Sequence, residues 1–219
     1  MGRVAVRLFT RRLNLRNPFT ISHGTYHWRD NVFVSIEYDG VIGIGEAPVV
    51  PYYGDTVESV VADIESNVTA ALVRRSVEES VAPETRFATS ASRCALNTAI
   101  VDIKAKRRGL SLGAYLELGT ARPTLTSYTI PYNESAEAMV RSAEGHACLK
   151  VKLGFPDDIE KLRVLRRRSP NAIIRIDANQ GWSLPEALRK VKALEQLGVE
   201  LIEEPLSTSL DEVEALASL

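Results

Sequence analysis

Two lysines placed two residues apart are the first groups in this sequence that could perform proton chemistry. Lys150 and Lys152 lie in an apolar segment, residues 147–154, that is typical of a β-strand. Side chains two apart in a strand share one face, so both ammonium groups point the same way. Each charge lowers the pKa of its neighbour, and a lysine whose neutral form is accessible near pH 7 can act as a general base. The alternative, which spacing alone leaves open, is an edge strand whose lysines face solvent.

Two carboxylates end the next two predicted strands. Asp177 closes a segment in which polar and apolar residues alternate, and Glu203 closes a short apolar run. Lys152, Asp177 and Glu203 follow one another at about 25 residues, which places one group on each strand–helix unit. The carboxyl ends of parallel barrel strands meet at one rim, and two adjacent carboxylates there suit Mg²⁺. Taken singly, Asp177 would be a turn former or N-cap and Glu203 an exposed acid, so the combination carries the prediction.

The elements that must position these groups alternate in the second half of the chain. Four strand–helix units can form an open sheet or half of a (β/α)8 barrel. The predicted strands are 124–130, 147–153, 172–177 and 199–203, and the predicted helices are 135–144, 157–168, 184–197 and 210–219.

The first half of the chain indicates strands followed by helices. The predicted strands are 3–9, 31–38 and 41–46, and the predicted helices are 56–73 and 90–108. Asp39-Gly40 is a two-residue hairpin signal between the second and third strands. The fold class expected is therefore an α+β capping domain over residues 1–120, followed by a partial (β/α) TIM-type barrel of about four units over 121–219.

Composition and charge exclude several classes of function. The 219 residues carry a net charge of −1 with a pI near 6.3, which argues against a nucleic-acid partner. Apolar runs stay far below the roughly 20 residues that a membrane span needs. Two cysteines without paired spacing are typical of a cytoplasmic protein. An open nucleotide-binding α/β fold ranks last, because no Gly-rich phosphate loop follows a strand.

These motifs together resemble the enolase superfamily, in its muconate-lactonizing branch, and most closely the dipeptide (L-Ala-D/L-Glu) epimerases. The resemblance covers nearly the whole chain, and the lysine and carboxylate motifs are the specific part of it. The segments that carry it are Lys150-Val151-Lys152, Asp177-Ala178-Asn179-Gln180-Gly181-Trp182, Glu203-Glu204-Pro205, Gly43 to Pro48, Arg93 to Lys106 and Thr126 to Ile130.

The resemblance implies a metal-dependent epimerase or racemase. Such an enzyme, an isomerase, removes the proton alpha to a carboxylate, here of a dipeptide, through an Mg-stabilised enediolate. Lys152 would be the base, and Lys150 would lower its pKa and help to hold the substrate carboxylate. Asp177 and Glu203 would bind the divalent metal, Mg²⁺.

Further roles follow from the same resemblance. Asn179 would contact the residues that bind metal and substrate and hold them in position, whereas Glu204 is not assigned as a ligand. Thr129 or Thr126 would touch the substrate, and the loop over residues 18–28 has the place of the family's specificity loop. The expected partner is a small carboxylate substrate, with no nucleic acid and no membrane, and a homo-oligomer stays open.

The resemblance also implies a chain that is truncated at its C-terminus. Relatives supply a third carboxylate ligand and a second lysine from later strands, so this chain alone is expected to have little or no activity. The alternatives are an o-succinylbenzoate synthase, an N-acylamino-acid racemase or a cycloisomerase of the same superfamily, which share these motifs. A noncatalytic fragment or scaffold is the alternative from a different class.

Overall fold

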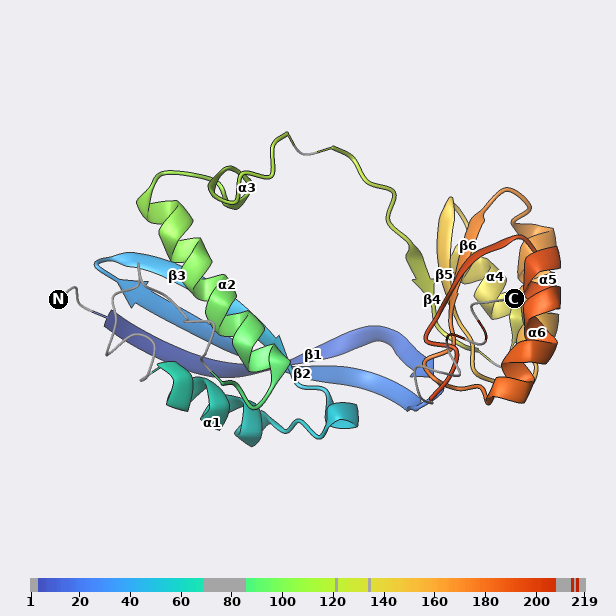
Figure 1. The fold of residues 1–219 in the computed structure, drawn as a ribbon, viewed down its shortest axis with the longest axis horizontal. Helices are drawn as coiled ribbons and strands as arrows, with labels where there is room; N and C mark the ends of the chain where they lie inside the picture. The colour runs from blue at the N-terminus through green and yellow to red at the C-terminus, as the bar shows by residue number, and fades with distance from the viewer. Residues whose placement is uncertain are drawn as a thin grey trace. The chain divides into compact units, whose positions relative to one another are not determined.

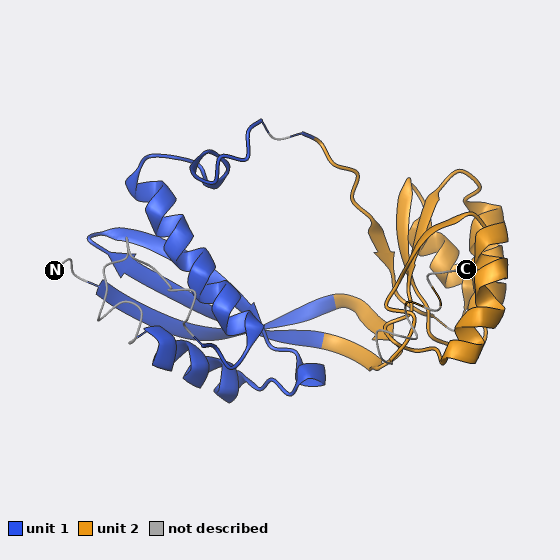
Figure 2. Cartoon of the chain, in the orientation of Figure 1, with its two compact units in different colours: residues 1–15, 28–122 blue, residues 16–27, 123–219 orange. Residues whose placement is uncertain are grey.

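The computed structural model describes residues 4–68, 86–120, 122–133, 135–207, 214 and 216. It divides into two compact units (Figure 2), one made of Met1–Leu15 and Trp28–Arg122, the other of Arg16–His27 and Pro123–Leu219. The tip of the first hairpin therefore groups with the C-terminal unit. Residues 69–73 of the first predicted helix, and nearly all of the predicted helix 210–219, lie outside the described residues.

The N-terminal unit is an antiparallel sheet with helices on one face (Figure 1). The strand order is β1-β2-β3, and Tyr38 pairs with Val41 across the predicted Asp39-Gly40 turn. Its elements are β1 (Val4–Ile21), β2 (Gly24–Tyr38), β3 (Val41–Pro48), the 3-10 turn η1 (Pro51–Tyr53), α1 (Val57–Val68), α2 (Ser90–Arg107) and α3 (Leu112–Tyr115).

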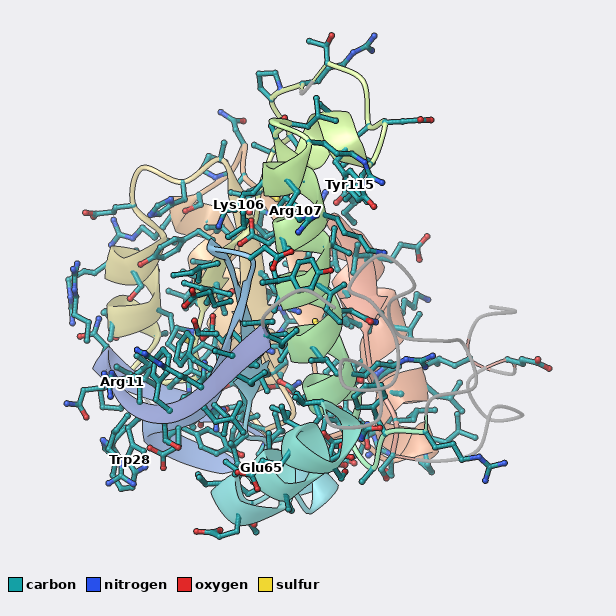
Figure 3. The ribbon with its side chains drawn as sticks, turned by 90° about the vertical axis from the view of Figure 1, so that its left-hand side faces the viewer. Arg11, Trp28, Glu65, Lys106, Arg107 and Tyr115 are labelled. Atoms are coloured by element: carbon teal, nitrogen blue, oxygen red, sulfur yellow. The ribbon has the colours of Figure 1, made fainter. Side chains whose placement is uncertain are left out.

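The alternation of buried and exposed side chains in β2, together with Gly43 and Gly45 in β3, explains how helix α2 packs on this sheet. Val32, Val34 and Ile36 are fully buried under the helices, as a period of two predicts. A Cβ added at Gly45 would lie 1.8 Å from the Ala95 carbonyl oxygen, so only glycine lets α2 approach this closely. Figure 3 views this unit from its side, with Lys106 and Arg107 labelled on α2 and Glu65 on α1.

The first two strands are longer than the sequence predicts. We expected the first strand to end at residue 9 and a loop over 18–28, whereas β1 continues to Ile21 and turns at once into β2. Side chains from residue 9 to 14 are all exposed, so this stretch carries no alternation of buried and exposed positions. A ribbon that is exposed on both faces lacks the signal that predicts a strand.

The C-terminal unit contains a parallel sheet of order β4-β5-β6-β7. Strand–helix alternation is as predicted, although β4 is shorter than expected. This confirms the fold class, an α+β domain followed by parallel βα units that are consistent with a partial barrel. The elements are β4 (Tyr128–Ile130), α4 (Ala136–Ala143), β5 (Cys148–Lys152), α5 (Asp158–Arg168), β6 (Ile173–Asp177), α6 (Leu184–Gln196) and β7 (Val199–Glu203).

Helices α4, α5 and α6 cover one face of this parallel sheet (Figure 1). Leu149 and Val151 of β5, with Ile174 and Ile176 of β6, are fully buried on that face. The alternate positions, which include both lysines of β5, form the opposite, polar face. Among the helices that the structure describes, none combines the length and apolarity that would let it cross a membrane.

Candidate active site

Strand register brings the predicted chemical groups to one rim of the parallel sheet. Lys152 lies directly opposite Asp177, and Asp177 lies directly opposite Glu203. All three are the last residues of their strands. Strand β5 is a central strand and Lys152 is buried, which rules out the alternative of solvent-facing lysines on an edge.

Lysine–carboxylate ion pairs join these side chains into one cluster. Lys152 Nζ donates to Asp177 Oδ2 at 2.6 Å, and Lys150 Nζ lies 2.9 Å from the same oxygen. Lys150 Nζ is also 2.5 Å from Glu203 Oε2. One ammonium group therefore bridges the two carboxylates, and a positive charge is stabilised between them.

The electrostatics differ from the sequence prediction at Lys150. Burial lowers the pKa of Lys150, but hydrogen bonds and attraction from Glu203 and Asp177 outweigh burial and raise it above its ordinary value. Mutual lowering of the lysine pKa values is therefore wrong for Lys150, because two carboxylates stand beside it. Burial alone would raise the pKa of Asp177, whereas hydrogen bonds from Lys152, Lys150 and the Asn179 backbone N–H hold it below its ordinary range.

Burial falls across the cluster from β6 to β7. The Asp177 side chain is 2% exposed and that of Lys152 is 9% exposed, whereas the Glu203 side chain is 45% exposed. A buried ion pair has few alternative partners, so the Lys152–Asp177 pair is geometrically fixed. The Glu203 end of the cluster is the part that an incoming ion or ligand can reach.

Asn179 links Lys152 to the loop that follows β6 through a hydrogen bond. Lys152 Nζ donates to Asn179 Oδ1 at 3.0 Å, and the Asn179 backbone N–H donates to Asp177 Oδ1 at 2.9 Å. Asp177 thus also forms the turn that a lone aspartate suggested. Asn179 therefore contacts both members of the buried pair and fixes the direction of the Lys152 amine.

The two threonines predicted to touch substrate are placed differently from each other. Thr129 lies in β4 directly opposite Lys150 and is half-buried, at the level of the cluster. Thr126 precedes β4 and is exposed. Thr129 is therefore the better positioned of the two beside the lysines.

The tip of the first hairpin, which the resemblance gave the place of the specificity loop, contacts the rim through residues whose partners the sequence did not indicate. The Phe19 ring lies 5.9 Å from Lys152 Nζ, and Ser22 Oγ donates to the Asn179 backbone oxygen at 2.5 Å. Thr20 accepts a backbone hydrogen bond from Tyr132, which follows β4. No local pattern marks these hairpin residues, since each partner lies more than 100 residues away.

Asp158 is a second residue that the sequence did not single out. Its carboxylate is fully buried at the start of α5 and accepts from the backbone N–H groups of Gly154 and Phe155, at 3.1 and 3.0 Å. It also accepts from Trp182 Nε1 at 2.7 Å and from Lys190 Nζ at 2.8 Å. One carboxylate therefore ties together the loops after β5 and β6 and helix α6.

Two carboxylates in this cluster fit a hard divalent cation. Asp177 and Glu203 are paired in register and already share one positive charge, the Lys150 ammonium. Oxygen ligands from one or two carboxylates are typical of Mg²⁺ sites, which draw further ligands from water and substrate. Within the described ranges, no cluster of three or more acidic, histidine or cysteine side chains could hold a metal without such added ligands.

Comparison with known families places the chain in the enolase superfamily. Residues 3–116 match the mandelate racemase / muconate lactonizing enzyme N-terminal domain, and residues 132–219 match the enolase C-terminal domain-like family. The chain therefore belongs to the mandelate racemase / muconate lactonizing enzyme family, as the motifs predicted.

Several of the similar proteins are named as epimerases, and one is an N-succinyl-L-Arg/Lys racemase from Bacillus cereus. An L-Ala-D/L-amino acid epimerase from Flavobacterium johnsoniae is 32% identical over 206 residues, which are 89% of this chain and 59% of the relative. A crystal structure of an enolase family member from Agrobacterium tumefaciens, with homology to dipeptide epimerases and with bound sodium and L-Ala-L-Glu, superposes with a TM-score of 0.84. The two sequences are 34% identical, and the superposition covers 97% of this chain and 65% of the Agrobacterium tumefaciens chain.

A further solved structure carries magnesium. The dipeptide epimerase from Enterococcus faecalis, complexed with Mg and L-Leu-L-Tyr, superposes with a TM-score of 0.85 at 26% identity, over 97% of this chain and 64% of that one. The chain spans about 60% of the length of the curated relatives that it matches.

Proposed function

We propose that the protein is a metal-dependent epimerase that removes the proton on the carbon next to a carboxylate, with dipeptides as the substrate class. The observation that carries the proposal is the cluster of Lys150, Lys152, Asp177 and Glu203 at one rim of the parallel sheet. Family membership and the names of the relatives support the reaction class.

The two lysines would divide the work on the substrate. Lys152 is buried, directed by Asp177 and Asn179, and in its neutral form would accept the proton from the substrate carbon. Lys150 is more exposed and bridges two carboxylates, so its ammonium is suited to hold the substrate carboxylate. Thr129 would line the same face.

Asp177 and Glu203 would hold the metal. When bound, a divalent ion such as Mg²⁺ supplies positive charge that attracts the substrate carboxylate and makes the adjacent C–H more acidic. The cluster without it holds two ammonium groups and two carboxylates, so it is near neutral. A divalent ion would therefore leave a net positive site that favours an anionic substrate over a neutral one.

Hydrogen–deuterium exchange at the substrate α-carbon tests the proposal directly. The complete protein, as its gene encodes it, is incubated in D₂O with Mg²⁺ and either L-Ala-L-Glu, other dipeptides or N-succinyl amino acids. We expect deuterium to enter the carbon next to the free carboxylate of a dipeptide. Lys152→Met should reduce exchange by about 100-fold or more.

Two outcomes would change the proposal. Exchange with N-succinyl amino acids alone would replace dipeptides with acylated amino acids as substrates of the same site. If calorimetry shows that the protein binds Mg²⁺ but no substrate exchanges its α-hydrogen for deuterium, the epimerase reaction is excluded.

A further inference from the structure

Ser22 connects the tip of the first hairpin to the loop that follows β6. It stands in the turn between β1 and β2, and its hydroxyl donates to the backbone oxygen of Asn179 at 2.5 Å. The two residues lie 157 positions apart in the chain. Asn179 is the residue that accepts from Lys152 through its side chain.

Two glycines make room for Ser22 at this point. A Cβ added at Gly154 or at Gly181 would lie 2.9 Å from the Ser22 Cβ, closer than real Cβ atoms approach. The Gly181 Cβ would also come within 2.6 Å of the Gly154 Cα. The loops after β5 and β6 therefore touch through their backbones, and Ser22 packs against both glycines.

The segment that Ser22 holds has an unusual backbone. Asn179 and Gln180 have φ angles of 45° and 60°, in the left-handed region that non-glycine residues seldom occupy. Surrounding structure must hold such residues in place. The Gln180 N–H donates to the Glu204 carbonyl at 2.7 Å on one side, and Ser22 binds Asn179 on the other.

We propose that Ser22 is a positioning residue, which fixes the Lys152 amine by fastening Asn179. The path is short: the Ser22 hydroxyl holds the Asn179 backbone, and the Asn179 side chain and N–H hold Lys152 and Asp177. This inference rests on the proposed function, because it assigns Ser22 to the orientation of the proposed base. It differs from a role in which the hairpin tip binds substrate.

Kinetics of Ser22→Ala separate these two roles. The substitution keeps the Cβ that fills the glycine junction and removes the hydroxyl alone. A misdirected base lowers kcat and leaves KM almost unchanged, whereas a lost substrate contact raises KM. We expect kcat for α-proton exchange to fall by about three- to tenfold, the range of one lost hydrogen bond.

Ser142→Ala is the matched control. Ser142 lies exposed in α4, and its hydroxyl also donates to a backbone oxygen, that of Ala138, at 3.1 Å. The control should leave kcat within about twofold of the unchanged protein. An unchanged kcat in Ser22→Ala, or a raised KM alone, would overturn the positioning role.

Amide hydrogen exchange of the protein gives a readout that needs no substrate. In Ser22→Ala the amides of Asn179 and Gln180 should exchange with D₂O about tenfold faster, and in Ser142→Ala they should not change. Unaltered amide exchange in Ser22→Ala would contradict the proposal that the Ser22 hydroxyl holds the Asn179 backbone in place. If the unchanged protein turned over no substrate, the proposed function would fail, and the amide result alone would decide whether Ser22 fastens Asn179.

Discussion

Trp182 donates its indole N–H to the buried carboxylate of Asp158 at 2.7 Å. Asp158 begins helix α5, which follows β5, and Trp182 lies in the loop after the next strand, β6. Lys190 of α6 binds the same carboxylate, so this single side chain is a shared anchor for three segments. The rim that carries the lysine–carboxylate cluster depends on this anchor for its shape.

Asp158→Ala should destabilise the protein strongly. The change leaves the Lys190 ammonium and two loop N–H groups without their buried acceptor, and losses of this kind cost about 3–5 kcal/mol. The measurement is urea unfolding followed by circular dichroism. Glu160→Gln, an exposed position two residues along the same helix, is the control and should shift stability by less than about 0.5 kcal/mol. Equal midpoints for the two variants would contradict the anchoring role.

Gly45→Ala should unfold the N-terminal unit or weaken it severely. The new Cβ would meet the Ala95 carbonyl oxygen at 1.8 Å, so β3 and α2 must move apart. We expect the free energy of unfolding to fall by more than about 3 kcal/mol, which a lower thermal unfolding midpoint would reveal. Gly113→Ala is the matched control, because nothing lies within 4 Å of a Cβ there. Comparable losses in both variants would mean that close packing is not the cause.

Glu203→Gln should weaken binding of divalent metal. The substitution removes one of two carboxylate charges at the proposed site, and a loss of at least about tenfold in affinity is expected. Titration calorimetry with Mg²⁺ measures it. Glu204→Gln is the neighbouring control. The Glu204 backbone carbonyl accepts from Gln180, but its side chain is not assigned as a metal ligand. Equal weakening by both changes would point to general charge rather than to a site.

Acid should weaken the start of helix α6 through Glu186. The Ser183 backbone N–H and hydroxyl bond its carboxylate and hold its pKa below the ordinary value. A lowered folded-state pKa gives stability that is present above the unfolded pKa and disappears as pH falls through the folded one. Glu186→Ala should therefore be less stable than the unchanged protein at about pH 6, and the difference should shrink as the pH falls below the unfolded-state pKa of about 4.3. A gap that is independent of pH would exclude this cause.

Much of the candidate site could be predicted because strands impose simple rules. A period of two puts Lys150 and Lys152 on one face, and regular strand–helix units bring Asp177 and Glu203 to the same rim. Their roles as base, carboxylate holder and metal ligands stay predictions. The pKa of Lys150 could not be predicted, because it depends on which carboxylate oxygens reach its ammonium.

Ser22 and Asp158 show what the sequence could not supply. A serine in a turn has the same local signature whether or not it holds a backbone carbonyl 157 residues away. Asp158 looks like an ordinary acidic residue in the first turn of a helix, where such residues are common. The length of β1 was missed for a related reason, since its exposed residues 9–14 show no pattern of burial.

The Lys150 ammonium that bridges Asp177 and Glu203 would make uptake of a divalent metal an exchange of cations. An ion held by both carboxylates would displace this ammonium from their oxygens. The affinity that a titration reports would then reflect the difference in binding free energy between the ion and the ammonium at this pair of carboxylates. Neutralising Lys150 by substitution would tighten metal binding even though a positive residue had been removed from the neighbourhood of the substrate.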